Sequence, residues 1–221
     1  MKSVLLTRSI DGNKETIEEI SKYSLNLRYI DCPLIKYKKL DLNIDILNNY
    51  SNIIVTSKYA ANILANYDLT QDIWVVGNKS KQLLGKKVAY TAQNIEDLIK
   101  HFPPDLYQQT IYLSSNEITQ DLPDKITRHI VYNVEYLNEL PLPVIEEFKK
   151  NSIDFILLYS QNSAKTLIKL LNETKLQNSL VIAISSKVAN IIRPFIKNVV
   201  YCDDENPNNI IKLLVENAKV R

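Results

Sequence analysis

Short apolar runs typical of β-strands alternate along this chain with stretches that carry apolar residues at helical spacing. The candidate strands are residues 4–6, 27–30, 53–55, 73–76, 88–90, 111–113, 129–136, 153–158, 181–184 and 199–201. Between them, apolar side chains recur three or four positions apart, as at Ile17 and Ile20 or at Leu167 and Leu171. Because strands that alternate with helices form βαβ units, the pattern predicts an α/β fold with parallel sheets flanked by helices.

The number of candidate strands favours two domains. The chain has 221 residues, and domains usually hold about 100–150. Ten short strands are many for one open sheet of this size, so we expect two five-stranded sheets. Residues 53–60 (IIVTSKYA) resemble 156–164 (ILLYSQNSA), and 74–80 resemble 182–188. A duplicated domain would leave such a likeness, but unrelated α/β units share it too, so duplication stays open.

Two segments interrupt the alternation and indicate where the domains join. Residues 29–39 (YIDCPLIKYKK) contain Pro33, and residues 132–143 (YNVEYLNELPLP) contain Pro141 and Pro143. A residue before proline avoids the helical region, so both segments should be extended. We therefore expect a discontinuous α/β domain of residues 1–32 and 140–221, a second α/β domain of residues 37–131, and interdomain linker strands at 33–36 and 132–139.

Most chemistry with a recognisable sequence spacing is excluded. The glycines stand at 12, 77 and 85, the histidines at 101 and 129, and the cysteines at 32 and 202. Three glycines this far apart build neither a dinucleotide-binding loop nor a phosphate loop. Histidines and cysteines at these spacings give no zinc motif and no C-x-x-C pair. We expect neither a cofactor nor a metal.

Charge and hydropathy limit the kinds of partner that we expect this protein to bind. The formal net charge is +2, and the basic residues are scattered, without the clusters that mark a nucleic-acid footprint. Apolar runs of four to six residues are too short for a membrane span or a secretory signal. Two unspaced cysteines are typical of ordinary thiols in a reducing compartment. We expect a cytoplasmic monomer that binds neither nucleic acid nor membrane.

Hydroxyl and amide side chains gather where the candidate strands end. These turns are Thr7-Arg8, Thr56-Ser57, Gly77-Asn78 with Ser80, Ser114-Ser115-Asn116, Ser160 with Ser163, and Ser185-Ser186. In open α/β sheets, ligands bind at the carboxyl ends of the strands. Each turn should open a helix, and helix N-termini attract anions. The set predicts a cleft for a ligand with several carboxylates or phosphates, although Ser, Thr and Asn are also ordinary N-caps.

Nucleophilic catalysis has little support. No serine stands in a G-x-S-x-G elbow. Structural roles are expected for Cys32, Cys202 and His129, which show no sequence sign of a catalytic partner. Tyr132 and Tyr136 differ, because their spacing places them on one face of a strand in the proposed interdomain segment. One of these phenols could therefore reach the ligand.

The ordered set of turns resembles a known family. The motifs are VLLTR at 4–8, IIVTS at 53–57, VVGNKS at 75–80, IYLSSNEITQD at 111–121, VEY at 134–136, LYSQNSA at 158–164 and IAISSKVA at 182–189. In this order and spacing they resemble the uroporphyrinogen-III synthases. The resemblance covers nearly the whole chain and rests on the ordered set, because the family is divergent and no single motif is specific.

The resemblance implies two α/β domains joined by a two-stranded linker. It also implies cyclisation of hydroxymethylbilane, a linear tetrapyrrole with eight carboxylates, with inversion of the last pyrrole through a spiro intermediate, without cofactor or metal. By the same resemblance the catalytic residue is Tyr136, which would assist departure of the terminal hydroxyl. The implied substrate-binding residues are Arg8, Thr56, Ser57, Gly77, Asn78, Ser80, Ser115, Ser160 and Ser186. The chain departs from the family at Ser185-Ser186-Lys187, usually Gly-Pro-Thr, and at Ser115, where glycine is common.

Two other functions compete with the cyclase. A two-domain binding or sensor protein could hold a small polyanion without chemistry, and the strand pattern alone does not separate it from an enzyme. A nucleotide-dependent transferase is disfavoured by the lack of glycine-rich turns. The position of Tyr136 and turnover of hydroxymethylbilane discriminate between binding and catalysis.

Overall fold

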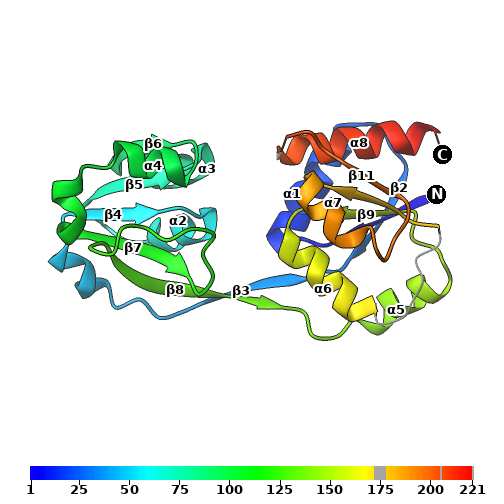
Figure 1. The fold of residues 1–221 in the computed structure, drawn as a ribbon, viewed down its shortest axis with the longest axis horizontal. Helices are drawn as coiled ribbons and strands as arrows, with labels where there is room; N and C mark the ends of the chain where they lie inside the picture. The colour runs from blue at the N-terminus through cyan, green and yellow to red at the C-terminus, as the bar shows by residue number, and fades with distance from the viewer. Residues whose placement is uncertain (172–177, 205, 221) are drawn as a thin grey trace. The chain divides into compact units, whose positions relative to one another are not determined.

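The computed structural model describes residues 1–171, 178–204 and 206–220, which form two compact units (Figure 1). Unit 1 comprises residues 1–36 and 135–221, and unit 2 comprises residues 37–134. Unit 1 is therefore built from two distant stretches of chain, whereas unit 2 is continuous. The prediction of an α/β fold with parallel sheets flanked by helices is confirmed.

Unit 1 contains a five-stranded parallel sheet in the order β11-β10-β9-β1-β2. Its strands are β1 (Lys2–Leu6), β2 (Leu27–Asp31), β9 (Phe155–Leu158), β10 (Leu180–Ala183) and β11 (Val199–Tyr201). Its helices are α1 (Ile10–Ser21), α5 (Leu142–Lys149), α6 (Gln161–Leu171), α7 (Ser186–Ile192) and α8 (Pro207–Val220). Contacts pair α1 with α8 and α6 with α7, on opposite faces of the sheet (Figure 1).

The core of unit 1 explains why its strands β9 and β10 are unbroken apolar runs. All four residues of β9 and of β10 are buried. A parallel strand covered by helices on both faces needs apolar side chains in both directions. β1 and β9 lie side by side with Val4 opposite Phe155. The first strand of the chain therefore pairs with a strand about 150 residues further along the sequence.

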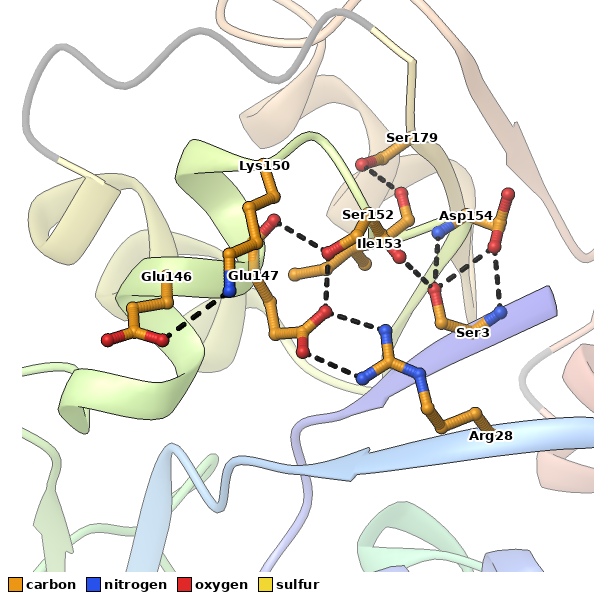
Figure 2. A network of polar contacts seen from close by, with 9 residues as sticks. All are labelled: Ser3, Arg28, Glu146, Glu147, Lys150, Ser152, Ile153, Asp154 and Ser179. Atoms are coloured by element: carbon orange, nitrogen blue, oxygen red, sulfur yellow. Dashed lines mark hydrogen bonds and ion pairs between the residues drawn. The ribbon is translucent and has the colours of Figure 1, made fainter. Parts of the chain in front are cut away.

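A polar network joins the two stretches of unit 1 at the amino ends of its strands (Figure 2). The Arg28 guanidinium on β2 makes two hydrogen bonds, of 2.7 and 2.6 Å, to the Glu147 carboxylate on α5. The Ser152 hydroxyl also donates to that carboxylate. Beside them, the Asp154 carboxylate accepts from the Ser3 backbone N–H at 2.7 Å, and the Asp154 N–H donates to the Ser3 hydroxyl at 2.9 Å.

Unit 2 contains a six-stranded sheet in the order β3-β8-β7-β4-β5-β6. Its strands are β3 (Ile35–Lys39), β4 (Asn52–Val55), β5 (Asp72–Val76), β6 (Val88–Ala92), β7 (Thr110–Ser115) and β8 (Thr127–Tyr136). Its helices are α2 (Lys58–Leu64), α3 (Asn78–Leu84) and α4 (Ile95–His101), with 3-10 helices η1 (Ile44–Asn49), η2 (Gly85–Lys87) and η3 (Pro104–Gln109). The pairs from β8 through β6 are parallel.

The expectation of two five-stranded sheets is wrong for unit 2. Residues 35–39 were expected to be extended, and they form the edge strand β3 beside β8. The Leu137 N–H donates to the Leu34 carbonyl and the Leu40 N–H to the Val131 carbonyl, both at 2.9 Å, so the strands run antiparallel. Lysine-rich edge strands have one unpaired side and lack the apolar run of a central strand.

One predicted helix is also absent. The turn Ser114–Asn116 was expected to open a helix, but residues 116–126 contain none. The Arg128 guanidinium donates to the carbonyls of Ser115 and Asn116, at 2.7 and 3.1 Å. The Asn116 side chain accepts from the Val134 N–H at 2.7 Å. Carbonyls that a helix would use are therefore bonded to Arg128 on the neighbouring strand.

Within the described ranges, no helix combines the length and the apolar character needed to cross a membrane.

Candidate functional site

In unit 1, Arg8 follows β1 and folds back onto the first turns of α1. Its Nη1 donates to the Gly12 carbonyl at 3.0 Å and to the Thr16 hydroxyl at 3.2 Å, and its Nη2 lies 3.7 Å from a Glu15 carboxylate oxygen. The guanidinium carbon sits 4.9 Å from the centre of the Tyr159 ring. A side chain at Gly12 would stand 2.9 Å from Arg8 Cβ, so the glycine makes room for this arrangement.

The turn after β9 brings two predicted residues together. The Ser160 hydroxyl accepts from the Ser163 N–H at 3.0 Å and donates to the Ser163 hydroxyl at 2.8 Å, which is an N-cap arrangement at α6. Two residues past Ser160, Asn162 Nδ2 donates to the Tyr136 hydroxyl at 2.7 Å. The predicted catalytic phenol and the Ser160 turn therefore meet at the start of one helix.

In the turn after β10, the buried hydroxyl belongs to Ser185 and not to the predicted Ser186. Ser186 is exposed at the first position of α7. Ser185 is only 8 % exposed, and among the described residues its hydroxyl meets no hydrogen-bond partner. Tyr159 directly follows the neighbouring strand β9, and burial raises the pKa of its phenol, opposed by the nearby Thr16 hydroxyl and the Arg8 charge. A buried hydroxyl without a partner is unusual, so Ser185 is a candidate that the sequence pattern ranked no higher than its neighbour.

In unit 2, Thr56 and Ser57 follow β4, as predicted. The Ser57 hydroxyl caps α2 by accepting from the Ala60 N–H at 3.1 Å, and it also accepts from the Tyr132 hydroxyl at 3.0 Å. Thr56 Oγ1 lies 2.8 Å from the Tyr112 hydroxyl. Sequence reasoning missed Tyr112, because nothing in the pattern of β7 distinguishes it from an ordinary core residue.

The turn after β5 combines an unusual backbone with a buried hydroxyl. Gly77 has φ +82°, a conformation that side-chain-bearing residues rarely adopt, and its N–H donates to the Ala92 carbonyl at 2.9 Å. Asn78 is exposed, whereas Ser80 is only 2 % exposed. The Gly77 turn therefore presents Asn78 to solvent and turns Ser80 inward.

Ser115 ends β7 and is held by its surroundings. Its hydroxyl donates to the Glu117 carbonyl, and its carbonyl accepts from Arg128. Arg128 Nε also donates to the Ser114 hydroxyl at 2.9 Å. This places a guanidinium beside the predicted turn that no sequence motif identified.

Each sheet gathers its share of the predicted residues at the carboxyl ends of its strands. The unit 1 sheet has Arg8, Ser160 and Ser186 at its strand ends, and the unit 2 sheet has Thr56, Ser57, Gly77, Asn78, Ser80 and Ser115. Tyr136 is the last residue of β8, a strand of the six-stranded sheet, and lies in the part of that strand that belongs to unit 1. A search of the described ranges finds no group of three or more His, Cys, Asp or Glu side chains placed to hold a metal ion. The groups at these turns are hydrogen-bond donors, tyrosine phenols and guanidinium groups, which suit an acidic organic ligand.

The sequence of this chain matches the model of a known protein family. Residues 15–211 match the family model described as uroporphyrinogen-III synthase HemD. The chain belongs to the uroporphyrinogen-III synthase family. An uncharacterized protein of Rickettsia prowazekii (strain Madrid E) is 63 % identical to this chain, and the two align over their whole lengths.

Two solved structures share the synthase fold. A uroporphyrinogen-III synthetase from Helicobacter pylori 26695 is 15 % identical, with a TM-score of 0.63 over 98 % of this chain and 99 % of that one. A mutant uroporphyrinogen III synthase from the extremely thermophilic bacterium Thermus thermophilus is 10 % identical, with a TM-score of 0.56 over 100 % of this chain and 99 % of that one. At such low identities the likeness establishes the fold alone.

Proposed function

We propose that this protein is a uroporphyrinogen-III synthase that cyclises hydroxymethylbilane to uroporphyrinogen III, inverting the last pyrrole ring and releasing water. The observation that carries the proposal is the family match over residues 15–211. The donor groups at the strand ends of both units support it, because a substrate with eight carboxylates needs many donors. Carboxylates accept hydrogen bonds and attract guanidinium groups such as those of Arg8 and Arg128.

The chemistry begins with loss of the terminal hydroxyl. Hydroxide is a poor leaving group, so a proton donor at that oxygen lowers the barrier. In the proposed reaction, the Tyr136 phenol donates to the departing hydroxyl. Asn162 Nδ2 donates to the same phenol oxygen at 2.7 Å, which orients the ring and strengthens the phenol as a donor.

The remaining steps require placement of the substrate more than further acid–base catalysis. Loss of water leaves a resonance-stabilised azafulvene cation. Attack by the substituted carbon of the last pyrrole gives a spiro intermediate, and its fragmentation and reclosure invert that ring. Residues that hold the carboxylates decide which carbon of the last ring faces the cation. In this account Thr56, Ser57 and Ser160 bind and orient the substrate.

Consumption of the linear bilane separates an enzyme from a binding protein. Hydroxymethylbilane is generated in situ, and its disappearance is followed with the protein, with heat-denatured protein and with buffer. The proposal predicts loss well above the spontaneous rate, in proportion to protein concentration. A polyanion-binding protein without catalysis would leave the rate unchanged or would slow it, and either result would overturn the proposal.

A further inference from the structure

Two buried tyrosines hold the turn that follows β4 in unit 2. Tyr132 on β8 is 5 % exposed, and its hydroxyl donates to Ser57 Oγ at 3.0 Å. Tyr112 on β7 is 3 % exposed, and its hydroxyl lies 2.8 Å from Thr56 Oγ1. Each hydroxyl of the turn therefore has a phenol of its own, supplied by a different strand.

The hydrogen bonds at Ser57 fix the direction of its own proton. A serine hydroxyl has one donor and two acceptor positions. Ser57 Oγ accepts from the Ala60 N–H at 3.1 Å and from the Tyr132 hydroxyl, which fills both acceptor positions. The structure gives that proton no acceptor among the residues it describes. Ser57 is thus left as a donor toward whatever binds at the turn.

The hydrogen bond between Thr56 and Tyr112 also has one favoured direction. A buried phenol whose proton has no acceptor is destabilising, so Tyr112 should donate. Thr56 Oγ1 is the acceptor that the structure places beside it. Burial also raises the pKa of Tyr112, which keeps the phenol protonated. The Thr56 hydroxyl can then donate its own proton to a different acceptor.

Aromatic packing keeps Tyr132 in place. Its ring centre lies 4.8 Å from that of Tyr59 and 5.6 Å from that of Tyr37, the latter in an edge-to-face arrangement. A ring enclosed in this way has little freedom to swing away from Ser57. The phenol is therefore a fixed donor.

We propose that Tyr112 and Tyr132 are positioning residues that make the Thr56 and Ser57 hydroxyls oriented donors to substrate carboxylates. The proposal rests on the proposed function, which supplies the carboxylates. A hydroxyl that accepts a hydrogen bond becomes a stronger donor, and a carboxylate can only accept. Neither tyrosine needs to touch the substrate.

Double-mutant cycles test this role, with the fluorescent octacarboxylate uroporphyrin III as the probe in a binding titration. Loss of the Ser57 donor in Ser57→Ala should raise Kd about 10- to 100-fold, because the bond lost is to a charged group. Tyr132→Phe should raise Kd about 3- to 10-fold in the wild-type background and leave it unchanged in Ser57→Ala. Tyr112→Phe should behave in the same way toward Thr56→Val, which gives a second, independent pair.

Tyr107→Phe is the matched control, because Tyr107 lies on η3 before the amino end of β7 and stacks on Phe102. Its Kd should equal that of the wild type. Thermal unfolding of every variant without ligand reports any purely structural effect. Equal Kd increases from the tyrosine substitutions with and without the partner hydroxyl would show a structural role and overturn the proposal, as would no increase at all.

The binding cycles and the bilane assay can fail independently of each other. Bilane consumption by the wild type, together with absent coupling in both cycles, would overturn the positioning role and leave the synthase activity standing. Coupling in the cycles without bilane consumption would overturn the activity and leave an oriented carboxylate-binding turn.

Discussion

Tyr136 is the residue on which the proposed chemistry depends most. Tyr136→Phe removes one oxygen, so the protein should stay folded while kcat falls about 10- to 1,000-fold. Water or a substrate carboxylate can replace part of the assistance, which is why the loss is not expected to be complete. Steady-state kinetics with hydroxymethylbilane measure the change.

The control for Tyr136→Phe should change a tyrosine that contacts none of the predicted substrate-binding turns. Tyr132, on the same strand, is unsuitable because its hydroxyl bonds to Ser57. Tyr23 follows α1 in unit 1 and is 39 % exposed, so Tyr23→Phe should keep wild-type kcat. If Tyr136→Phe also keeps it, the phenol only packs, and the substrate-binding turns act by positioning alone.

The cysteines should be inert in the native protein. Cys32 and Cys202 are both buried, and burial raises the pKa of each thiol to about 11. The thiolate is the reactive form, so at pH 8 its population falls about 100-fold relative to an ordinary thiol. A colorimetric thiol reagent should label the native protein slowly and label both thiols at once in denaturant. Rapid native labelling would contradict the burial of these side chains.

Among the elements, α5 depends on the ion pair that joins it to β2. Glu147 has its pKa lowered to about 2 by its hydrogen bonds to Arg28 and Ser152. A carboxyl with a depressed folded-state pKa stabilises the protein above its unfolded pKa of 4.5, and this stabilisation is lost as the pH falls from about 4.5 to about 2. Because the pair is partly exposed, we expect Glu147→Gln to lower the free energy of unfolding by roughly 1 kcal/mol at pH 7.

The neighbouring residue supplies a control on the same helix. Glu146 pairs with Lys150 at 3.6 Å, and both side chains are about two-thirds exposed (Figure 2). Urea unfolding at pH 7 and pH 3 should show a loss for Glu147→Gln that shrinks at the lower pH, and almost no change for Glu146→Gln. Equal losses for the two variants would mean that the Arg28 pair adds nothing beyond surface charge.

The elements also show what the sequence could and could not predict. The strands from β4 to β10 were predictable wherever burial on both faces imposes an apolar run, as in Phe155–Leu158. β3 was expected only to be extended, because Ile35–Lys39 carries exposed lysines in place of the apolar run that marks a central strand. The missing helix after Ser115 depends on Arg128, twelve or more residues away, and no local pattern reports such a contact.

The candidate site was predictable to the level of turns and not of individual hydroxyls. Thr56, Ser57 and Ser160 could be placed at strand ends because the strand and helix signals bracket them. That Ser185 is buried and Ser186 exposed depends on how α7 packs. That Ser57 meets Tyr132 depends on the register shift between β7 and β8 and on packing across the sheet. These are tertiary facts without a sequence signature.

For the whole molecule, the division into units has a consequence for truncation. Unit 2 is continuous from residue 37 to residue 134 and has its own buried clusters, whereas the middle of the unit 1 sheet comes from β9 and β10. A chain ending at residue 140 should therefore keep unit 2 folded and lose unit 1. Limited proteolysis should leave a resistant fragment close to residues 37–134 and digest residues 1–32. Protection of the first 32 residues, or digestion throughout, would contradict independent cores.

The isomer of the cyclised product distinguishes a uroporphyrinogen-III synthase from a protein that leaves ring closure to proceed unaided. Hydroxymethylbilane left alone closes to uroporphyrinogen I, so the isomer formed reports whether the last ring was inverted. Substrate generated in situ is incubated with dialysed, chelator-treated protein, and the oxidised uroporphyrins are separated by chromatography. We expect isomer III to dominate and its fraction to rise with protein concentration. Isomer I in the same proportion as in the protein-free reaction would contradict it.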